Sequence, residues 1–170
     1  MGNRTCMRLS GLVLIAATCP YTLVDAEELA SSKTVIGETN SLLADGAAAL
    51  QAGRIEEGVR LTLEGLKGRL TPQENAAGHS NACAGYILLK QWAEALAQCN
   101  AALAIDSSNW RTYNNRAGIY IEQGLYDLGL KDLQAGLALA PEAATLHESL
   151  RILERNRRLT GRRARRTVPS

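Results

Sequence analysis

Large and small apolar positions recur through the middle of the chain at a fixed spacing of 34 residues. The matching pairs are Tyr86 and Tyr120, Ile87 and Ile121, Trp92 and Tyr126, Leu96 and Leu130, Leu103 and Leu137, Ala95 and Gly129, and Ala102 and Gly136. A repeat of this length marks a supersecondary unit that buries its apolar face only by stacking on its neighbours. The pattern therefore predicts an extended array of stacked units, and the recurring small residues predict close contacts between helices.

Local signals indicate that each unit is a pair of helices. Asn109 is a suitable N-cap for a helix that starts at Trp110. Gly53 and Gly124 fall where the first helix of a unit ends, a position that favours a left-handed residue without a Cβ atom. Pro141 ends the third unit and suits the first turn of a further helix. These signals predict an all-α chain of helical hairpins.

The register resembles the tetratricopeptide repeat (TPR), whose motif combines bulky, small and aromatic residues with a final proline. In the third unit the matching residues are Tyr113, Ala117, Tyr120, Gly124, Tyr126, Gly129, Gly136, Leu137 and Pro141. A first unit, from Leu42 to Leu66, precedes the second by 37 residues, and we expect the three extra residues in the loop 70–74. The resemblance implies a right-handed superhelical stack of about three hairpins with a C-terminal capping helix.

The chain divides into four predicted segments. A signal peptide occupies residues 1–26 and a flexible lead-in residues 27–38. The TPR domain spans 39–156, with units at about 39–72, 76–109 and 110–143 and a capping helix at 144–156. Residues 157–170 are predicted to form a basic, disordered tail.

The amino terminus has the pattern of a secretory signal. Arg4 and Arg8 precede the apolar stretch 9–18, which is too short to cross a bilayer of about 30 Å. Val24-Asp25-Ala26 supplies small residues where a signal peptidase reads, so we expect cleavage after Ala26 and a periplasmic or secreted protein. A lipoprotein form at Cys19 is not expected, because the residues before it match a lipoprotein signal poorly.

Charge is distributed unevenly behind the net value of +2. Residues 27–150 contain 9 basic and 15 acidic residues, whereas residues 151–170 contain eight arginines and one glutamate. The predicted tail arginines are Arg157, Arg158, Arg162, Arg163, Arg165 and Arg166. One interpretation is a tether to an anionic membrane surface or another polyanion. The others are a solvated tail without a partner, and a tail folded onto the acidic body. Nucleic acid is not expected, since no aromatic residue lies among the arginines.

Two cysteines, Cys83 and Cys99, remain after the predicted cleavage. An oxidising compartment favours a disulfide between them. However, symmetric pairing about a turn near Lys90 places residue 83 opposite residue 96, which suggests a Cα separation above the limit of about 7 Å. We therefore expect two buried free thiols that pack as small apolar residues.

No motif for catalysis, for a cofactor or for a metal is found in the sequence, so we expect a protein that is not an enzyme. His79 and His147 stand alone at helix starts and fit packing positions. The acidic residues Glu56, Glu57, Asp127 and Asp132 fit solvated faces of second helices.

The TPR resemblance implies that a partner protein or peptide binds in a concave groove lined by the first helix of each unit. The candidate groove residues are Ser80, Asn81, Arg111, Asn114, Asn115 and Glu122. Asparagine suits a groove because its amide donates to and accepts from a peptide backbone. The alternative is that the asparagines only solvate or cap the helix. A homo-oligomeric scaffold also remains open.

One subtype, the carboxylate clamp, is matched only in part. Asn81 matches a clamp asparagine and Arg111 stands in place of a clamp lysine. Leu43, Ala47 and Asn115 replace the other polar and charged clamp residues, so tight capture of a C-terminal carboxylate is not expected.

We predict that the mature protein begins at Glu27. Mass spectrometry of the N-terminal peptide from cells that make the native protein checks this. A retained Met1, or a lipid on Cys19, would refute the predicted cleavage.

Overall fold

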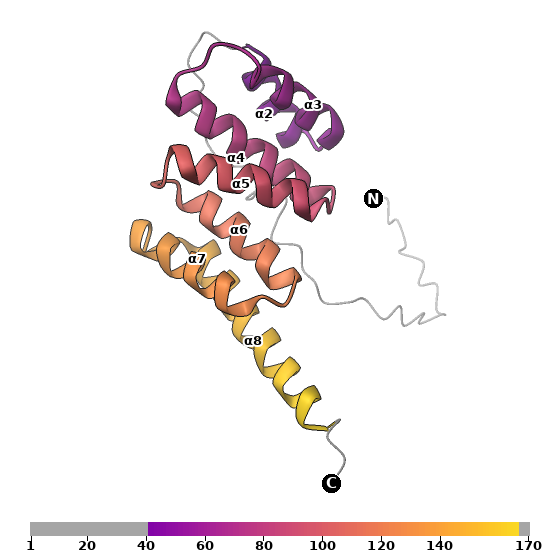
Figure 1. The fold of residues 1–170 in the computed structure, drawn as a ribbon, viewed down its shortest axis with the longest axis vertical. Helices are drawn as coiled ribbons and strands as arrows, with labels where there is room; N and C mark the ends of the chain where they lie inside the picture. The colour runs from indigo at the N-terminus through magenta and orange to yellow at the C-terminus, as the bar shows by residue number, and fades with distance from the viewer. Residues whose placement is uncertain (1–40, 167–170) are drawn as a thin grey trace, which may run out of the picture.

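The computed structural model describes residues 41–166 and, within them, the side chains of residues 41–161. The described part contains seven helices and no strand: α2 (Ser41–Gln51), α3 (Ile55–Gly65), α4 (Pro72–Leu88), α5 (Trp92–Ile105), α6 (Trp110–Glu122), α7 (Tyr126–Leu139) and α8 (Ala144–Arg166). The first six helices form three stacked antiparallel hairpins, and α8 closes the C-terminal end (Figure 1). The predicted all-α stack is confirmed. The predicted signal peptide and lead-in lie outside the described residues.

The three hairpins share one turn geometry. One residue of each turn has a left-handed backbone: Gly53 at φ 74°, Lys90 at φ 58° and Gly124 at φ 73°. In each turn a backbone N–H donates to a carbonyl five residues earlier, at 2.9, 2.9 and 2.8 Å for Arg54, Gln91 and Leu125. The predicted glycine turns are confirmed. The middle hairpin makes the same turn with a lysine, at an expected cost of about 1 kcal/mol relative to glycine.

The three extra residues before the second unit belong to a helix and not to the predicted loop. The Thr71 hydroxyl accepts a hydrogen bond from the Glu74 N–H at 3.2 Å, and the Glu74 carboxylate accepts one from the Thr71 N–H at 2.8 Å. This capping box, with Pro72 in the first turn, starts α4 early. As a result α4 has 17 residues, against 13 in α6.

The stack has an inner face, which we define as the side formed by the first helices α2, α4, α6 and α8. Successive first helices contact one another along the stack. No comparable contact joins α3 to α5 or α5 to α7 within residues 41–166. Because the first helices approach more closely than the second helices, the array curves toward the first helices.

Small residues allow the close helix contacts that the repeat predicted. A Cβ atom on Gly46 would lie 2.4 Å from the Thr62 Oγ1 and 2.8 Å from its backbone nitrogen. A Cβ atom on Gly136 would lie 2.8 Å from a methyl carbon of Leu146. Ala95 and Ala102 are also buried, at 0% and 2% exposure. The prediction of close-contact positions is confirmed.

Cys83 and Cys99 form a disulfide, so the prediction of two free thiols is wrong. Their Cα atoms are 5.2 Å apart, inside the bridging range. The error came from counting residues symmetrically about the turn. The contact is set by which face of α5 meets α4, and that face consists of Ala95, Cys99 and Ala102, spaced four and three residues apart.

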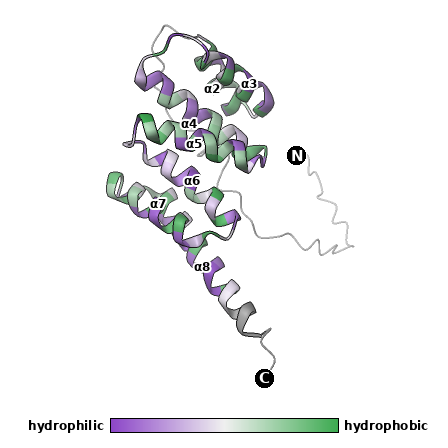
Figure 2. Cartoon of the chain, viewed as in Figure 1, coloured by the Kyte–Doolittle hydropathy of each residue, from purple (hydrophilic) through white to green (hydrophobic). Residues whose placement is uncertain are grey.

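The last helix is longer than predicted. We expected it to end at residue 156 and residues 157–170 to be disordered, but α8 continues to Arg166. Arginine is a good helix former, and the first proline after Pro141 is Pro169. Contacts with α7 also hold the extension, since the Tyr126 hydroxyl lies 3.2 Å from the Thr160 hydroxyl. Figure 2 shows hydrophilic residues where α8 leaves the stack.

Gly46→Ala should destabilise the fold, because the added Cβ collides with the backbone of α3 and the two helices must separate. We expect a loss of about 2 kcal/mol or more in the free energy of unfolding, measured by urea denaturation.

Gly118→Ala is the matched control. Nothing lies within 4 Å of a Cβ atom at Gly118, so only the higher helix propensity of alanine acts. We expect unchanged or increased stability, by up to about 1 kcal/mol. Equal destabilisation by the two substitutions would contradict the described packing.

Reduction of the disulfide should destabilise the protein, because the bridge restricts the unfolded chain over a sequence separation of 16 residues. We expect a loss of about 3 kcal/mol and a fall in Tm of about 10 °C for the Cys83→Ala/Cys99→Ala variant. A thermal melt of this variant beside the oxidised protein measures the effect. Free thiols in the unreduced protein would contradict the bridge.

Candidate functional site

The inner face of α6 carries a line of residues at successive helical turns. Arg111, Asn115, Gly118 and Glu122 are spaced four, three and four residues apart, which places them on one side of the helix. Asn114 lies beside this line, one turn before Gly118. The space above Gly118 is open, since a Cβ atom there would meet no atom within 4 Å. The other faces of α6 are packed, through Ala117 and the residues around it.

Most of the predicted polar residues on α4 and α6 are buried. Asn81, Asn114 and Asn115 are 4%, 6% and 3% exposed. Ser80 is 1% exposed, and its hydroxyl lies 2.8 Å from that of Thr112, which joins α4 to α6. Ser80 is therefore occupied by packing between helices. The structure thus buries four of the six predicted groove residues, with Ser80 the least accessible.

Asn114 has a polar atom without a protein partner. Its Oδ1 is buried and accepts no hydrogen bond from the described residues. A buried acceptor left unpaired is destabilising by about 1–3 kcal/mol, so native structures generally satisfy it with water or a ligand. Asn114 therefore carries a buried acceptor that no described residue satisfies.

Arg111 supplies positive charge at the start of the same line. Its guanidinium lies 4.4 Å from the centre of the Trp110 ring, a cation–π contact that orients the side chain. None of the ion pairs of the described residues includes Arg111, so its charge is available to a ligand. Glu122 is exposed at the far end of α6. The line therefore has a basic end and an acidic end.

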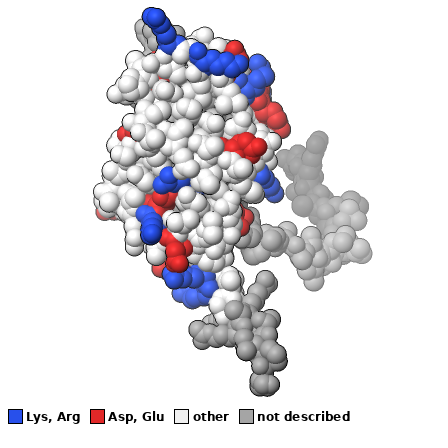
Figure 3. Space-filling model, in the orientation of Figure 1, with Lys and Arg blue, Asp and Glu red and all other residues white. Residues whose placement is uncertain are grey.

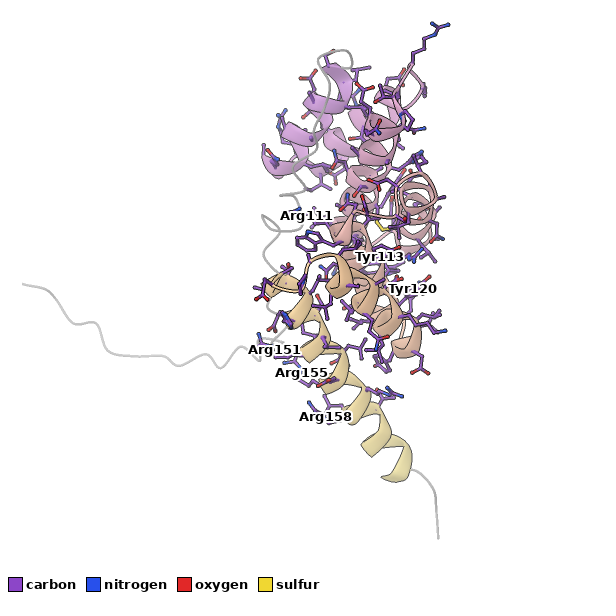
Figure 4. The ribbon with its side chains drawn as sticks, turned by 90° about the vertical axis from the view of Figure 1, so that its left-hand side faces the viewer. Arg111, Tyr113, Tyr120, Arg151, Arg155 and Arg158 are labelled. Carbon is purple, nitrogen blue, oxygen red and sulfur yellow. A yellow bond between two sulfur atoms is a disulfide. The ribbon has the colours of Figure 1, made fainter. Side chains whose placement is uncertain are left out.

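The opposite side of α6 holds the second helices together. Figure 4 shows Arg111 on one side of the molecule and Tyr113 and Tyr120 on the other. Between these tyrosines, Arg116 makes two hydrogen bonds of 2.7 Å to the Asp132 carboxylate and one of 2.7 Å to the Asn100 side-chain oxygen. The hydrogen bond to Asp132 raises the pKa of Arg116, although partial burial opposes the shift. Arg116 therefore connects α6 to both α5 and α7.

Asp132 corrects one expectation from the sequence. We predicted a solvated helix face, but Asp132 is 6% exposed and paired with Arg116. The two residues lie 16 positions apart on different helices, so no spacing within one helix indicates the pair. The sequence offered one signal of this burial, because Asp132 is an acidic residue among the small residues that pack α7 against its neighbours. Asp127 is exposed as predicted and lies 3.3 Å from Arg157.

The basic residues of the predicted tail lie on α8. Figure 3 shows Lys and Arg side chains gathered over α8, next to acidic ones. Arg157 and Arg158 are exposed. Arg162, Arg163, Arg165 and Arg166 belong to the same helix, but their side chains lie outside the described ones.

No group of three or more His, Cys, Asp or Glu side chains among the described residues could hold a metal ion. None of the helices between residues 41 and 166 is long and apolar enough to span a membrane.

Comparisons of the sequence with family models and with curated proteins gave no match. Solved structures do match. The first TPR domain of Spaghetti (RPAP3), bound to the HSP90 peptide SRMEEVD, has a TM-score of 0.62 and 23% identity, and the match covers 68% of this chain and 89% of that one. The TPR domain of Arabidopsis OM64 has a TM-score of 0.61 and 22% identity, with 68% and 93% covered.

A third match is the first TPR domain of the human RPAP3 protein, solved by NMR, with a TM-score of 0.61 and 22% identity. It covers 68% of this chain and 88% of that one. These matches agree with the order of the hairpins, their common turn and the small residues between their helices. The described part of the chain therefore has the fold of a tetratricopeptide-repeat domain.

Proposed function

We propose that this protein is a non-catalytic adaptor that binds an extended segment of a partner protein across its inner face. The observation that carries this proposal is the open space at Gly118 above the buried, unpaired Oδ1 of Asn114. Open space at Gly118 beside one unpaired acceptor suits a peptide backbone, because the backbone supplies an N–H at every residue except proline.

The chemistry of the face fits a segment that is largely neutral where it crosses α6. Asparagine amides pair with a backbone without requiring a charge. Arg111, oriented by Trp110, adds one cationic contact at the basic end of the line. The first TPR domain of Spaghetti (RPAP3), which has a similar fold, is bound to the HSP90 peptide SRMEEVD, and this supports peptide binding as the general mode.

A free C-terminal carboxylate is not required of the partner. The first hairpin offers Leu43 at 0% exposure where a carboxylate clamp needs a polar or cationic group. A carboxylate in the groove would therefore lack most of the charge-assisted hydrogen bonds that hold it. We infer that the protein recognises an internal segment.

We also propose that the protein functions after export, in a periplasmic or extracellular compartment. The Cys83–Cys99 disulfide supports this location, because disulfides form and persist in oxidising compartments and are rare in the cytosol. Both cysteines are 0% exposed, as expected for a bridge that stabilises the middle hairpin.

Gly118→Trp should block the inner face without unfolding it, because the indole ring would fill space that is open. The probe is a peptide selected from a phage-displayed random library against the wild-type protein. We expect its affinity, measured by fluorescence anisotropy, to fall at least about tenfold, a change of about 1.4 kcal/mol.

Gly161→Trp is the matched control, since Gly161 also lies on a helix with nothing within 4 Å of its Cβ position, but on α8. It should leave the affinity within about twofold of wild type. Equal affinity for the wild type and the Gly118→Trp variant would place peptide binding elsewhere. Circular dichroism checks that both variants keep their helicity.

A further inference from the structure

The exposed side of α8 carries a row of arginines, which we name the α8 strip: Arg151, Arg155 and Arg158. They are spaced four and three residues apart, so they lie on one side of the helix within about two turns. All three are exposed. The same spacing continues in the sequence at Arg162 and Arg166, within the helical part of the chain.

The opposite side of α8 is the one that packs against the stack. Leu146 and Leu153 are buried, at 0% and 1% exposure. Thr160 contacts the Tyr126 hydroxyl of α7, and Arg157 pairs with Asp127. Because these contacts fix the rotation of α8, the α8 strip points away from the stack and is held in a set orientation.

Most of the charge on the α8 strip is available. Arg151 pairs with Glu148, one turn earlier, but its side chain remains 75% exposed. Neither Arg155 nor Arg158 takes part in an ion pair with the described residues. A row of like charges on one helix destabilises it slightly, which an anionic ligand would relieve.

We propose that the α8 strip is a second binding site, and that it recognises an acidic segment of a partner protein. Guanidinium groups bind carboxylates through two parallel hydrogen bonds. The helix fixes the three guanidinium groups at a spacing of one turn, about 5.4 Å along the axis. Acidic side chains along an extended or helical segment can meet this spacing.

The flanking charges favour a narrow ligand over a flat anionic surface. Glu148 and Glu154 lie on the two sides of the α8 strip, each displaced from its centre line by part of a helical turn. A membrane surface would approach both carboxylates together with the arginines, and this repulsion weakens binding. A single acidic chain can follow the arginines between them.

This site is separate from the proposed peptide site but lies on the same side of the molecule. Figure 4 shows Arg151, Arg155 and Arg158 on the side where Arg111 points. One partner can therefore contact both sites, with a neutral segment on α6 and an acidic one on α8. The α8 strip does not depend on the inner face, so each proposal can fail without the other.

The test uses a fluorescein-labelled peptide of ten glutamates as the probe for the purified full chain. We expect Arg155→Glu/Arg158→Glu to weaken binding by at least about tenfold at physiological salt. Arg60→Glu/Lys131→Glu makes the same change in net charge on α3 and α7, and should change binding by less than about threefold. Gly118→Trp should have no effect on this probe.

Further measurements compare other anionic ligands with the oligoglutamate and check whether the substitutions affect folding. Vesicles containing phosphatidylserine and a single-stranded DNA oligonucleotide should bind more weakly than the oligoglutamate at equal charge concentration. Arg155→Gln/Arg158→Gln removes both charges, and glutamine is also a good helix former. This variant should weaken binding while its circular dichroism spectrum is unchanged. Equal losses in the α8 and the control variants would overturn the proposal. So would tighter binding of vesicles or DNA that depends on the α8 strip.

Discussion

The close approach of neighbouring helices at residues without a side chain is the constraint on which the structure depends. At Gly46 the backbone of α3 is so near that a Cβ atom would come within 2.8 Å of the Thr62 nitrogen. No rotamer change relieves a contact with backbone, so a larger residue must push the helices apart. At the other end of the stack, a Cβ atom on Gly136 would come within 2.8 Å of a side-chain methyl carbon of Leu146 in α8. The spacing between these neighbouring helices therefore follows from a few small residues.

The inner face follows from that spacing. Because the first helices contact one another along the stack, little room remains between them for long side chains. The residues at these contacts are short and polar: Ser80 pairs with Thr112, and Asn115 is almost fully buried. Gly118, which faces open space in the middle of α6, has no side chain at all. On the other side, Arg116 fixes the second helices through Asp132 and Asn100. A rigid outer layer and an open inner face suit a protein that holds a segment without changing shape.

The features that the sequence predicted correctly are local or periodic. The 34-residue repeat, the glycine turns and the close-contact positions all follow from the order of residue types along single helices. The errors concern contacts between helices. The Cys83–Cys99 bridge depends on the rotation of α5 against α4, which counting about a turn does not give. The pair of Arg116 and Asp132 crosses two helices, and the continuation of α8 depends partly on contacts with α7 that its own composition does not show.

The repeat register placed the candidate binding residues on first helices, which the structure shows to be α4 and α6, but their burial could not be read from residue type. Asparagine and serine are usually exposed, so the sequence suggested accessible side chains. In the structure they form a floor, and the accessible part of the face is the space above Gly118, which a motif of side chains cannot indicate.

Binding of a peptide on the inner face of α6 can be tested by NMR mapping. A ¹⁵N-labelled sample is titrated with the library-selected peptide while the backbone amide of Gly118 and the side-chain amide of Asn114 are followed. We expect large shift changes for these two groups and for Arg111, with little change at Tyr113 and Tyr120 on the opposite side. Changes confined to the opposite side, with Gly118 and Asn114 unaffected at saturation, would contradict binding on the inner face.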